Sequence, residues 1–263
     1  MARLALRFSV LGYLALLLLV PVGMVFWRAF EHGLAPAWDA VTTPQARHAF
    51  WLTTLITLIA VPLNTVFGVI AALAIVRRPF RGKGIVNAIV DLPLALSPVV
   101  VGLALFALYG RNGWLGPWLS DHGIRVIFAL PSMILATAFV SLPFVVREVV
   151  PVLREIGTEQ EQAASTLGAS PFQIFRRITL PAIRWAVAYG VVLTTARCLG
   201  EFGAVSVVSG RIEGRTETLT LHVQKSFESF DLVGAYSASV VLGLMAIGTL
   251  LLMTLFKPKE EAG

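Results

Sequence analysis

The segment Thr158–Pro181, with the sequence TEQEQAASTLGASPFQIFRRITLP, is a polar interruption in an otherwise apolar chain, and it decides the fold. Its pattern predicts a short helix that begins at Thr158. Thr158 and Glu161 have the Ser/Thr-x-x-Glu spacing of a capping box, in which each side chain satisfies an unpaired backbone N–H at the helix start. Gly168 is predicted to end this helix, because helices commonly close on a left-handed residue that glycine adopts without strain.

A second short helix is predicted to follow the turn. Ser170 offers a hydroxyl cap, and Pro171 suits the first helical position because its missing N–H costs nothing there. The pair Leu180-Pro181 is predicted to stop this helix. The segment is therefore expected to be a helical hairpin, and its exposed residues are small enough for a partner surface to approach closely: Ala163, Ala164, Gly168 and Ala169.

The composition is that of a membrane protein. Apolar residues make up 57% of the 263 residues and charged residues only 14%, whereas about a quarter of an average soluble protein is charged. The mean hydropathy is +0.80. The net charge of +6 is compatible with nucleic-acid binding, but basic residues gathered on one side of a membrane explain it equally well. The single cysteine, Cys198, is expected to pack as a small apolar residue.

Six apolar runs are long enough to cross a bilayer, which takes about twenty residues per helix. A cleavable signal peptide is the alternative for the first run, but it would need a small-x-small cleavage site, whereas this run ends in Met24-Val25-Phe26-Trp27. Pro62 and Asn64 are expected to interrupt the second span, which should then pack against neighbouring helices. The predicted spans are 8–27, 51–76, 85–109, 126–146, 185–208 and 232–256.

The positively charged residues predict the orientation, because cytoplasmic connections carry an excess of Lys and Arg. With six spans, the side that holds both termini has thirteen of them and the opposite side seven, so the termini and the hairpin 158–181 are expected in the cytoplasm. No internal repeat or long linker divides the chain, and a single transmembrane domain, 1–263, is predicted. The thirteen are Arg3, Arg7, Arg77, Arg78, Arg81, Lys83, Arg147, Arg154, Arg176, Arg177, Arg184, Lys257 and Lys259; the seven are Arg28, Arg47, Arg111, Arg125, Arg211, Arg215 and Lys225.

The sequence carries no catalytic pattern. No Gly-x-x-x-x-Gly-Lys-Ser/Thr phosphate loop occurs, and the nearest stretch, 210–216, has the wrong spacing and an arginine in place of the lysine. We therefore expect a transport subunit that is not an enzyme and holds no cofactor or metal itself, so that ATP–Mg would be hydrolysed on a partner subunit. The four histidines form no metal or catalytic spacing and all lie in connections predicted outside the cytoplasm: His32, His48, His122 and His222.

Charged residues inside the spans form a second candidate site. Arg197 and Glu201 are four residues apart, which places them on one face of a helix, and each alone would cost about 2.5–3.5 kcal/mol at the bilayer centre. They are expected to pair or to face a wet cavity. The pattern fits two roles: a salt bridge that fixes helix packing, or a direct role along the solute path. The other pathway candidates are Ser97 and Asp91 of the third span, and a helix-packing role also fits Asp91 because it lies near the cytoplasmic end.

The hairpin resembles the cytoplasmic EAA loop of permeases of ATP-binding-cassette (ABC) importers. Ala163-Ala164, Gly168 and Ile178-x-Leu180-Pro181 match the family pattern, whereas Gln162 stands where the family usually has glutamate and Glu161 comes one position early. In that family the loop docks into a cleft on the ATPase subunit. The resemblance therefore implies an ATPase-coupling role for Glu161, Gln162, Ala163, Ala164, Gly168, Ala169, Ile178, Leu180 and Pro181.

The run 199–221 indicates which kind of importer permease the chain resembles. Gly200-Glu201-Phe202-Gly203 is shared with molybdate permeases, whereas Ala204–Gly210 is similar to the W-type permease subunits of sulfate/thiosulfate importers. The resemblance implies an all-α, MetI-like type I importer fold with six transmembrane helices in the inner membrane. It also implies partners: a T-type permease as the other half of the path, two ATP-binding-cassette subunits and an extracytoplasmic sulfate/thiosulfate-binding protein.

Other functions remain open from the residues alone. A molybdate or tungstate permease differs only in solute, an ion-coupled secondary carrier needs no ATPase, and a membrane scaffold needs no solute path. The hairpin spacing also fits a DNA-binding helix-turn-helix, but spans begin within a few residues of both its ends, so nucleic acid is not an expected partner. A plain connecting loop would not need two capped helices.

Overall fold

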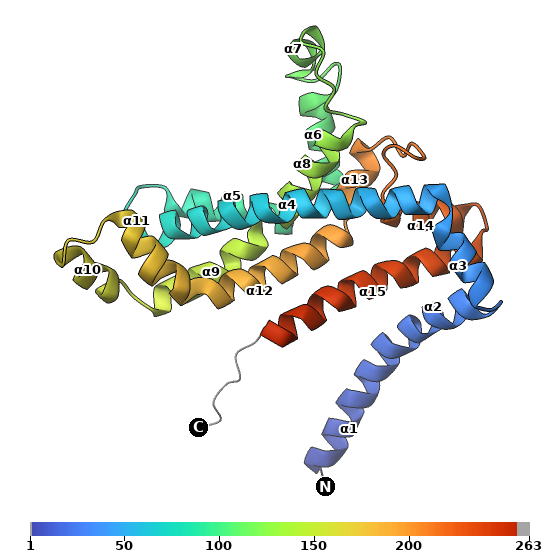
Figure 1. Cartoon of the computed structure of the whole chain (residues 1–263), viewed down its shortest axis with the longest axis horizontal. Helices are drawn as coiled ribbons and strands as arrows, with labels where there is room; N and C mark the ends of the chain where they lie inside the picture. Colours follow the sequence, from blue (N-terminus) through green and yellow to red (C-terminus); the bar gives the residue numbers. More distant parts are fainter. Residues whose placement is uncertain (1, 257–263) are drawn as a thin grey trace.

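The computed structural model describes residues 2–256, and every regular element among them is helical, which confirms the predicted all-α class (Figure 1). Lys257 and Lys259, which contribute to the predicted orientation, lie outside the described residues. The elements are α1 (Ala2–Leu14), the π-helical turn η1 (Ala15–Leu19), α2 (Val20–Phe30), α3 (Leu34–Thr42), α4 (Pro44–Arg77), α5 (Lys83–Ala95), α6 (Pro98–Tyr109), α7 (Gly116–Asp121), α8 (Leu130–Ser141), α9 (Pro143–Glu155), α10 (Glu159–Thr166), α11 (Pro171–Ile174), the π-helical turn η2 (Phe175–Thr179), α12 (Leu180–Leu199), α13 (Gly203–Val208), α14 (Leu219–Glu228) and α15 (Leu232–Phe256).

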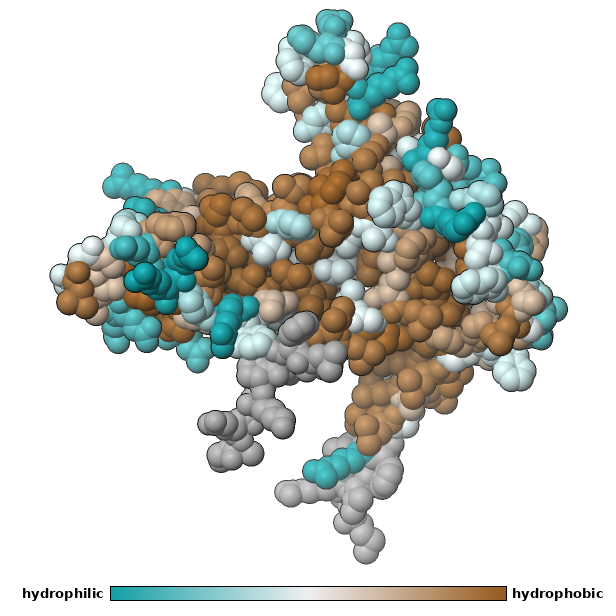
Figure 2. Space-filling model, in the orientation of Figure 1, coloured by the Kyte–Doolittle hydropathy of each residue, from teal (hydrophilic) through white to brown (hydrophobic). Residues whose placement is uncertain are grey.

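Five of the described helices, and one bent helix pair, are long and apolar enough to cross a membrane. Figure 1 shows the hairpin of α10 and α11 at one end of the long helix α4, and α3 and α14 at its other end. Apolar side chains cover the middle of the molecule, and hydrophilic ones gather over both of these ends (Figure 2). The candidate spans are Ser9–Phe30, Pro44–Arg77, Lys83–Ala95 with Pro98–Tyr109, Leu130–Glu155, Pro171–Leu199 and Leu232–Leu252.

The predicted third span, 85–109, is not one straight helix. α5 and α6 are bent by 111° relative to each other. Ser97, between them, has a ψ of 136°, because a residue before proline is pushed out of the helical region. Pro98 then begins α6. As a result, α6 and α7 project away from α4 as an arm (Figure 1).

The predicted bounds of the fourth and fifth spans are also wrong. The fourth candidate span is Leu130–Glu155 rather than 126–146, so its helix reaches the edge of the hairpin. The fifth is Pro171–Leu199 rather than 185–208, because Gly200 leaves the helix and the backbone restarts as the separate helix α13. The helix α15 covers the predicted range 232–256, and its candidate span is Leu232–Leu252.

The second span, α4, continues through Pro62 without the predicted interruption. Asn64 is buried, and its Nδ2 donates to the carbonyl of Ala138 at 2.9 Å and to Oγ of Ser141 at 2.8 Å. These bonds satisfy a polar side chain that would be costly in contact with lipid. The expected packing of this span against a neighbouring helix, here α8, is confirmed.

Val145 of α9 lies where three helices meet. Its side chain is fully buried. A Cβ atom added at Gly68 of α4 would lie 2.7 Å from Val145 Cβ, and one at Gly190 of α12 would lie 2.9 Å from Val145 Cα. Both distances are shorter than real Cβ contacts, so the close approach of α4, α9 and α12 depends on glycine at both positions.

A second close contact joins the base of the arm to α13. A Cβ at Gly102 of α6 would lie 2.7 Å from the carbonyl oxygen of Ala204, and one at Gly203 would lie 2.8 Å from Cβ of Pro98. The arm is therefore packed directly on the short helix that follows the break after Leu199.

We predict that Gly68→Ala destabilises the purified protein by about 1–3 kcal/mol, the usual cost of overpacking, because the new methyl group would overlap Val145. Gly243→Ala in α15 is the matched control, since no atom lies within 4 Å of a Cβ there. Thermal unfolding in detergent measures both variants. Equal unfolding midpoints for the two would contradict the packing described for Val145.

Candidate functional site

The turn and second helix of the hairpin 158–181 fold as local signals predict. Gly168 has a φ of +83°, the left-handed conformation expected of a glycine that ends a helix. Ser170 Oγ accepts from the N–H of Gln173, and Gln173 Oε1 accepts from the N–H of Ser170 at 2.8 Å. Pro171 lies in the first turn of α11. The predicted helix start at Ser170-Pro171 is confirmed.

Two other predictions for the hairpin are wrong. Thr158 makes no side-chain cap to α10; its Oγ1 instead accepts from Gln162 Nε2 at 3.1 Å. The pair Leu180-Pro181 does not stop the second helix, because Pro181 lies in the first turn of α12, and the helix Pro171–Leu199 is continuous through η2. A movement of the second hairpin helix is therefore a movement of the fifth span itself.

Glu161 joins the hairpin to the ends of the spans. Arg77, the last residue of α4, places its Nε 3.2 Å from Oε1 and 3.0 Å from Oε2 of Glu161. Thr179 Oγ1 donates to Glu161 Oε1 at 2.8 Å, and Arg77 Nη1 donates to the carbonyl of Leu153 near the end of α9 at 2.9 Å. These four residues are called the coupling junction below. The side chains of Arg77 and Glu161 are only 14% and 19% exposed, so water screens their attraction weakly.

The partners of Glu161 were not predicted from the sequence. Arg77 and Thr179 lie 84 and 18 residues away from it along the chain, and no local spacing reveals such contacts. In the sequence, Arg77 belongs to a basic cluster after a span, which predicted only the orientation in the membrane. The capping box is absent because the carboxylate of Glu161 binds the guanidinium of Arg77 instead of the backbone at Thr158.

The outer surface of the hairpin remains free for a partner. Gln162, at the position where the importer family usually has glutamate, is exposed. Space around the Cβ position of Gly168 is open, and Leu167 and Phe172 beside it are 88% and 69% exposed. Large apolar side chains next to small residues suit a protein–protein contact. Of the other predicted coupling residues, Ala163, Leu180 and Pro181 are exposed, and Ala164, Ala169 and Ile178 are partly buried.

Arg197 and Glu201 form the predicted ion pair, but not on one continuous helix. Glu201 lies in the break after Leu199, and its Oε2 is 2.7 Å from Nη2 of Arg197. Its Oε1 accepts from the N–H of Ala204 at 2.8 Å, and its carbonyl accepts from Thr220 Oγ1 at 2.8 Å. The Glu201 side chain is 2% exposed, against 28% for Arg197. This glutamate therefore connects α12 to the start of α13 and to α14.

The enclosed space beside Glu201 within this chain is small. A cavity of about 10 Å³ lies against Glu201, Thr137 and Thr218, which is room for about one water molecule. Glu201 Oε2 accepts no hydrogen bond among the described residues, because Arg197 approaches it without hydrogen-bond alignment. The packing role fits this geometry, and a role along a solute path stays a prediction.

The remaining pathway candidates lie elsewhere. Arg147 Nε donates to Asp91 Oδ1 at 2.7 Å, which ties α5 to α9 and fits the helix-packing alternative for Asp91. Ser97 is exposed at the bend between α5 and α6, and its side chain does not cap α6. Within residues 2–256, no hydrogen bond or ion pair connects Asp91 or Ser97 to the Arg197–Glu201 pair.

A bundle of membrane-spanning helices with a helical hairpin at one end is the architecture of a polytopic membrane permease. This chain belongs to the family of binding-protein-dependent transport system inner membrane components, which matches residues 64–261. The predicted family, that of ABC importer permeases, is confirmed.

Proteins of similar sequence support membership in this family. The sulfate transport system permease protein CysW of Synechococcus elongatus is 50% identical over 247 residues, which cover 94% of this chain and 86% of that protein. CysW of Escherichia coli strain K12 is 49% identical over 94% of this chain and 85% of its own length. CysT of Salmonella typhimurium is 40% identical over 90% and 88%.

The fold is also similar to two solved ABC transporters. A chain of a bacterial alginate ABC transporter superposes with a TM-score of 0.79 at 17% identity, covering 96% of this chain and 92% of that one. A chain of the MetNI methionine ABC transporter gives a TM-score of 0.55 at 18% identity, covering 80% and 95%. These similarities confirm the predicted MetI-like fold.

We predict that Glu161→Ala loosens the hairpin. The change removes the acceptor of Arg77 Nε and of Thr179 Oγ1, hydrogen bonds that contribute about 1 kcal/mol each. Together they contribute about 2 kcal/mol, so amide hydrogen exchange in 159–180 should become about thirtyfold faster, since about 1.4 kcal/mol corresponds to a factor of ten. Gln162→Ala, at the exposed neighbouring position, is the control. Equal exchange in the two variants would show that the junction does not hold the hairpin.

We predict that Arg197→Gln destabilises the protein more than Glu201→Gln does. The first change leaves a buried carboxylate without its counter-charge, at a cost of about 3 kcal/mol. The second keeps an amide oxygen that can accept from Ala204 and leaves an arginine with access to solvent. The double variant should recover part of the loss. Thermal unfolding gives the order, and the reverse order would be inconsistent with this geometry.

Proposed function

We propose that this chain is a permease subunit of an ATP-driven sulfate/thiosulfate importer, that it forms half of the translocation path and that its hairpin couples it to a separate ATPase. The observation that carries the substrate class is the 49–50% identity to sulfate permeases over 94% of the chain. The coupling role is supported by the junction, which fixes the hairpin to the span ends, and by the exposed surface around Gly168.

The proposed assembly contains four kinds of protein. A second, T-type permease forms the other half of the path, because CysT proteins are also related to this chain at 39–40% identity. Two ATP-binding-cassette subunits bind ATP–Mg, and one of them docks on the hairpin of this chain. An extracytoplasmic sulfate/thiosulfate-binding protein delivers the solute. In this arrangement the chain lies in the inner membrane with both termini and the hairpin in the cytoplasm, as the distribution of Lys and Arg predicts.

The geometry suggests how force would pass from the ATPase to the spans. The second hairpin helix is continuous with the fifth span, and Glu161 attaches α10 to the ends of α4 and α9 through Arg77. α4, α9 and α12 are then packed without space between them at Val145. Because closely packed helices move as a unit, a displacement of the hairpin would move the inner ends of three spans together.

Co-purification tests the proposed function. The subunit is purified with all proteins that remain bound, and ATPase activity is measured with sulfate-loaded and with molybdate-loaded binding proteins. An ATPase and a second permease that co-purify, with stimulation by the sulfate-loaded protein, support the proposal. Stimulation by the molybdate-loaded protein alone would make the chain a molybdate or tungstate permease. Purification as a single chain that transports without ATP would make it an ion-coupled secondary carrier.

We predict that Gly168→Asp abolishes uptake while the subunit remains inserted in the membrane. The change places charge and bulk on the exposed turn of the hairpin, where a partner surface would approach. Gly157→Asp is the matched control, since Gly157 also has a positive φ, of 64°, and no atom lies within 4 Å of a Cβ there. Uptake assays in cells with immunodetection of the subunit measure both. Normal uptake by Gly168→Asp would refute the coupling role.

A further inference from the structure

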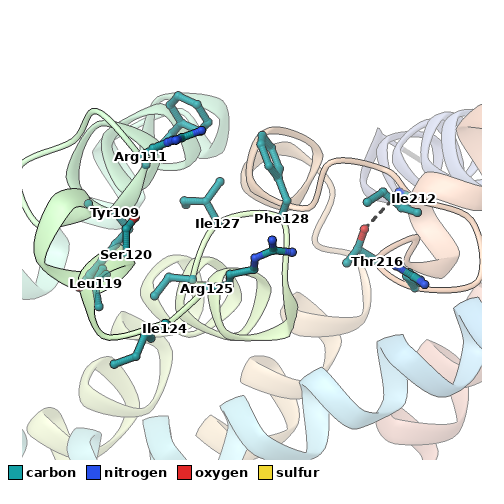
Figure 3. Close-up of a pocket in the computed structure, with 16 residues that line it drawn as sticks. Tyr109, Arg111, Leu119, Ser120, Ile124, Arg125, Ile127, Phe128, Ile212 and Thr216 are labelled. Carbon is teal, nitrogen blue, oxygen red and sulfur yellow. Dashed lines mark hydrogen bonds between the residues drawn. The ribbon is translucent and has the colours of Figure 1, made fainter.

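A pocket of about 810 Å³ opens beside the arm of α6 and α7. Its walls come from three segments of the chain: the arm, the connection that follows α7, and the loop between α13 and α14. Figure 3 shows Arg125 between Arg111 and Ser120 on one side and Thr216 on the other. Neither the coupling junction nor the Arg197–Glu201 pair lines this pocket.

Contacts between the segments hold the walls in place. The N–H of Phe128 donates to the carbonyl of Val208 at 2.9 Å, and the Phe128 ring lies 5.9 Å from that of Phe106 in α6. On the opposite wall, the N–H of Ile212 donates to Thr216 Oγ1 at 3.1 Å (Figure 3). The pocket is therefore defined by packing between distant parts of the chain.

The pocket carries positive charge that the chain itself does not neutralise. Arg111, Arg125 and Arg215 line it, and no aspartate or glutamate of the described chain does. None of these three arginines forms an ion pair within residues 2–256. By contrast, two other basic residues of the same predicted side are paired with carboxylates: Arg28 with Glu31 and Lys225 with Glu213.

We propose that this pocket binds tetrahedral oxyanions, with Arg111, Arg125 and Arg215 as the positively charged groups of its walls. Guanidinium groups match the oxygens of sulfate and phosphate with paired N–H donors, and a concave basic wall raises the local concentration of anions. The inference rests on the proposed function, in which the pocket receives the transported oxyanion on the outer side of the membrane. The pocket is large and has apolar walls, so the phosphate group of an anionic lipid is a second source of the same chemistry.

Arginine modification tests the pocket directly. The assembled transporter, in nanodiscs of phosphatidylcholine, is treated with phenylglyoxal, and the modification rate of each arginine is measured by peptide mass spectrometry. Sodium sulfate at about ten times its dissociation constant should slow modification of the three arginines about tenfold, relative to sodium chloride at equal ionic strength. Arg211 is the internal reference, because it lies in the same loop as Arg215, is exposed and does not line the pocket.

A comparison of lipids distinguishes a free oxyanion from a lipid phosphate. If nanodiscs that contain phosphatidylglycerol protect the three arginines and sulfate does not, the bound oxyanion is a lipid phosphate. Sulfate protection in neutral nanodiscs identifies the free oxyanion. Equal modification under all conditions, or three arginines that never react because a partner subunit covers them, would overturn the proposal.

Variants add a second readout. Arg125→Gln should weaken sulfate protection of Arg111 and Arg215 by about tenfold in apparent affinity, the effect of losing about 1.4 kcal/mol, and Arg211→Gln should leave it unchanged. The protection assay uses neither ATP nor the binding protein. If sulfate does not protect the arginines but still stimulates ATPase activity, the pocket is rejected and the importer function is not. If sulfate protects the arginines but does not stimulate ATPase activity, the importer function is rejected and the pocket is not.

Discussion

The contact between Arg77 and Glu161 is the constraint on which the arrangement of the hairpin depends. Without it, α10 would be attached to the bundle by the short connections at its two ends and by the hydrogen bond from Thr179 to Glu161. With it, Arg77 at the end of α4 binds both Glu161 of α10 and the carbonyl of Leu153 in α9, while Thr179, the residue before α12, donates to the same carboxylate. The pair is mostly removed from water, so its attraction is greater than that of an exposed ion pair.

This contact also gives two neighbouring residues different surroundings. Glu161, one position before the usual glutamate, is committed to the bundle, and Gln162 at the usual position faces outward. The surface proposed to dock on the ATPase is then uncharged at that position and includes small residues beside the exposed Leu167 and Phe172. Such a surface suits apolar contact with a partner more than an ion pair.

Local features of the fold could be predicted from the sequence, and contacts between distant residues could not. Gly168, Ser170 and Pro171 determine a turn and a helix start through their own backbone preferences, and the bounds of α15 follow from a single apolar run. The cap expected at Thr158 is absent because a distant arginine competes for Glu161. Pro98 after Ser97 indicates the bend, and Gly200 indicates the break after α12. The apolar composition nevertheless favoured continuous spans at both places.

The central claim is that the hairpin transmits ATPase movement to the spans through the coupling junction. The most direct test is the number of sulfate ions imported per ATP hydrolysed by the assembled transporter in proteoliposomes, compared between the natural chain and Glu161→Ala. The account predicts that the variant still binds the ATPase and hydrolyses ATP but imports less sulfate per ATP. An unchanged ratio would contradict it, because coupling would then not pass through Arg77 and Glu161.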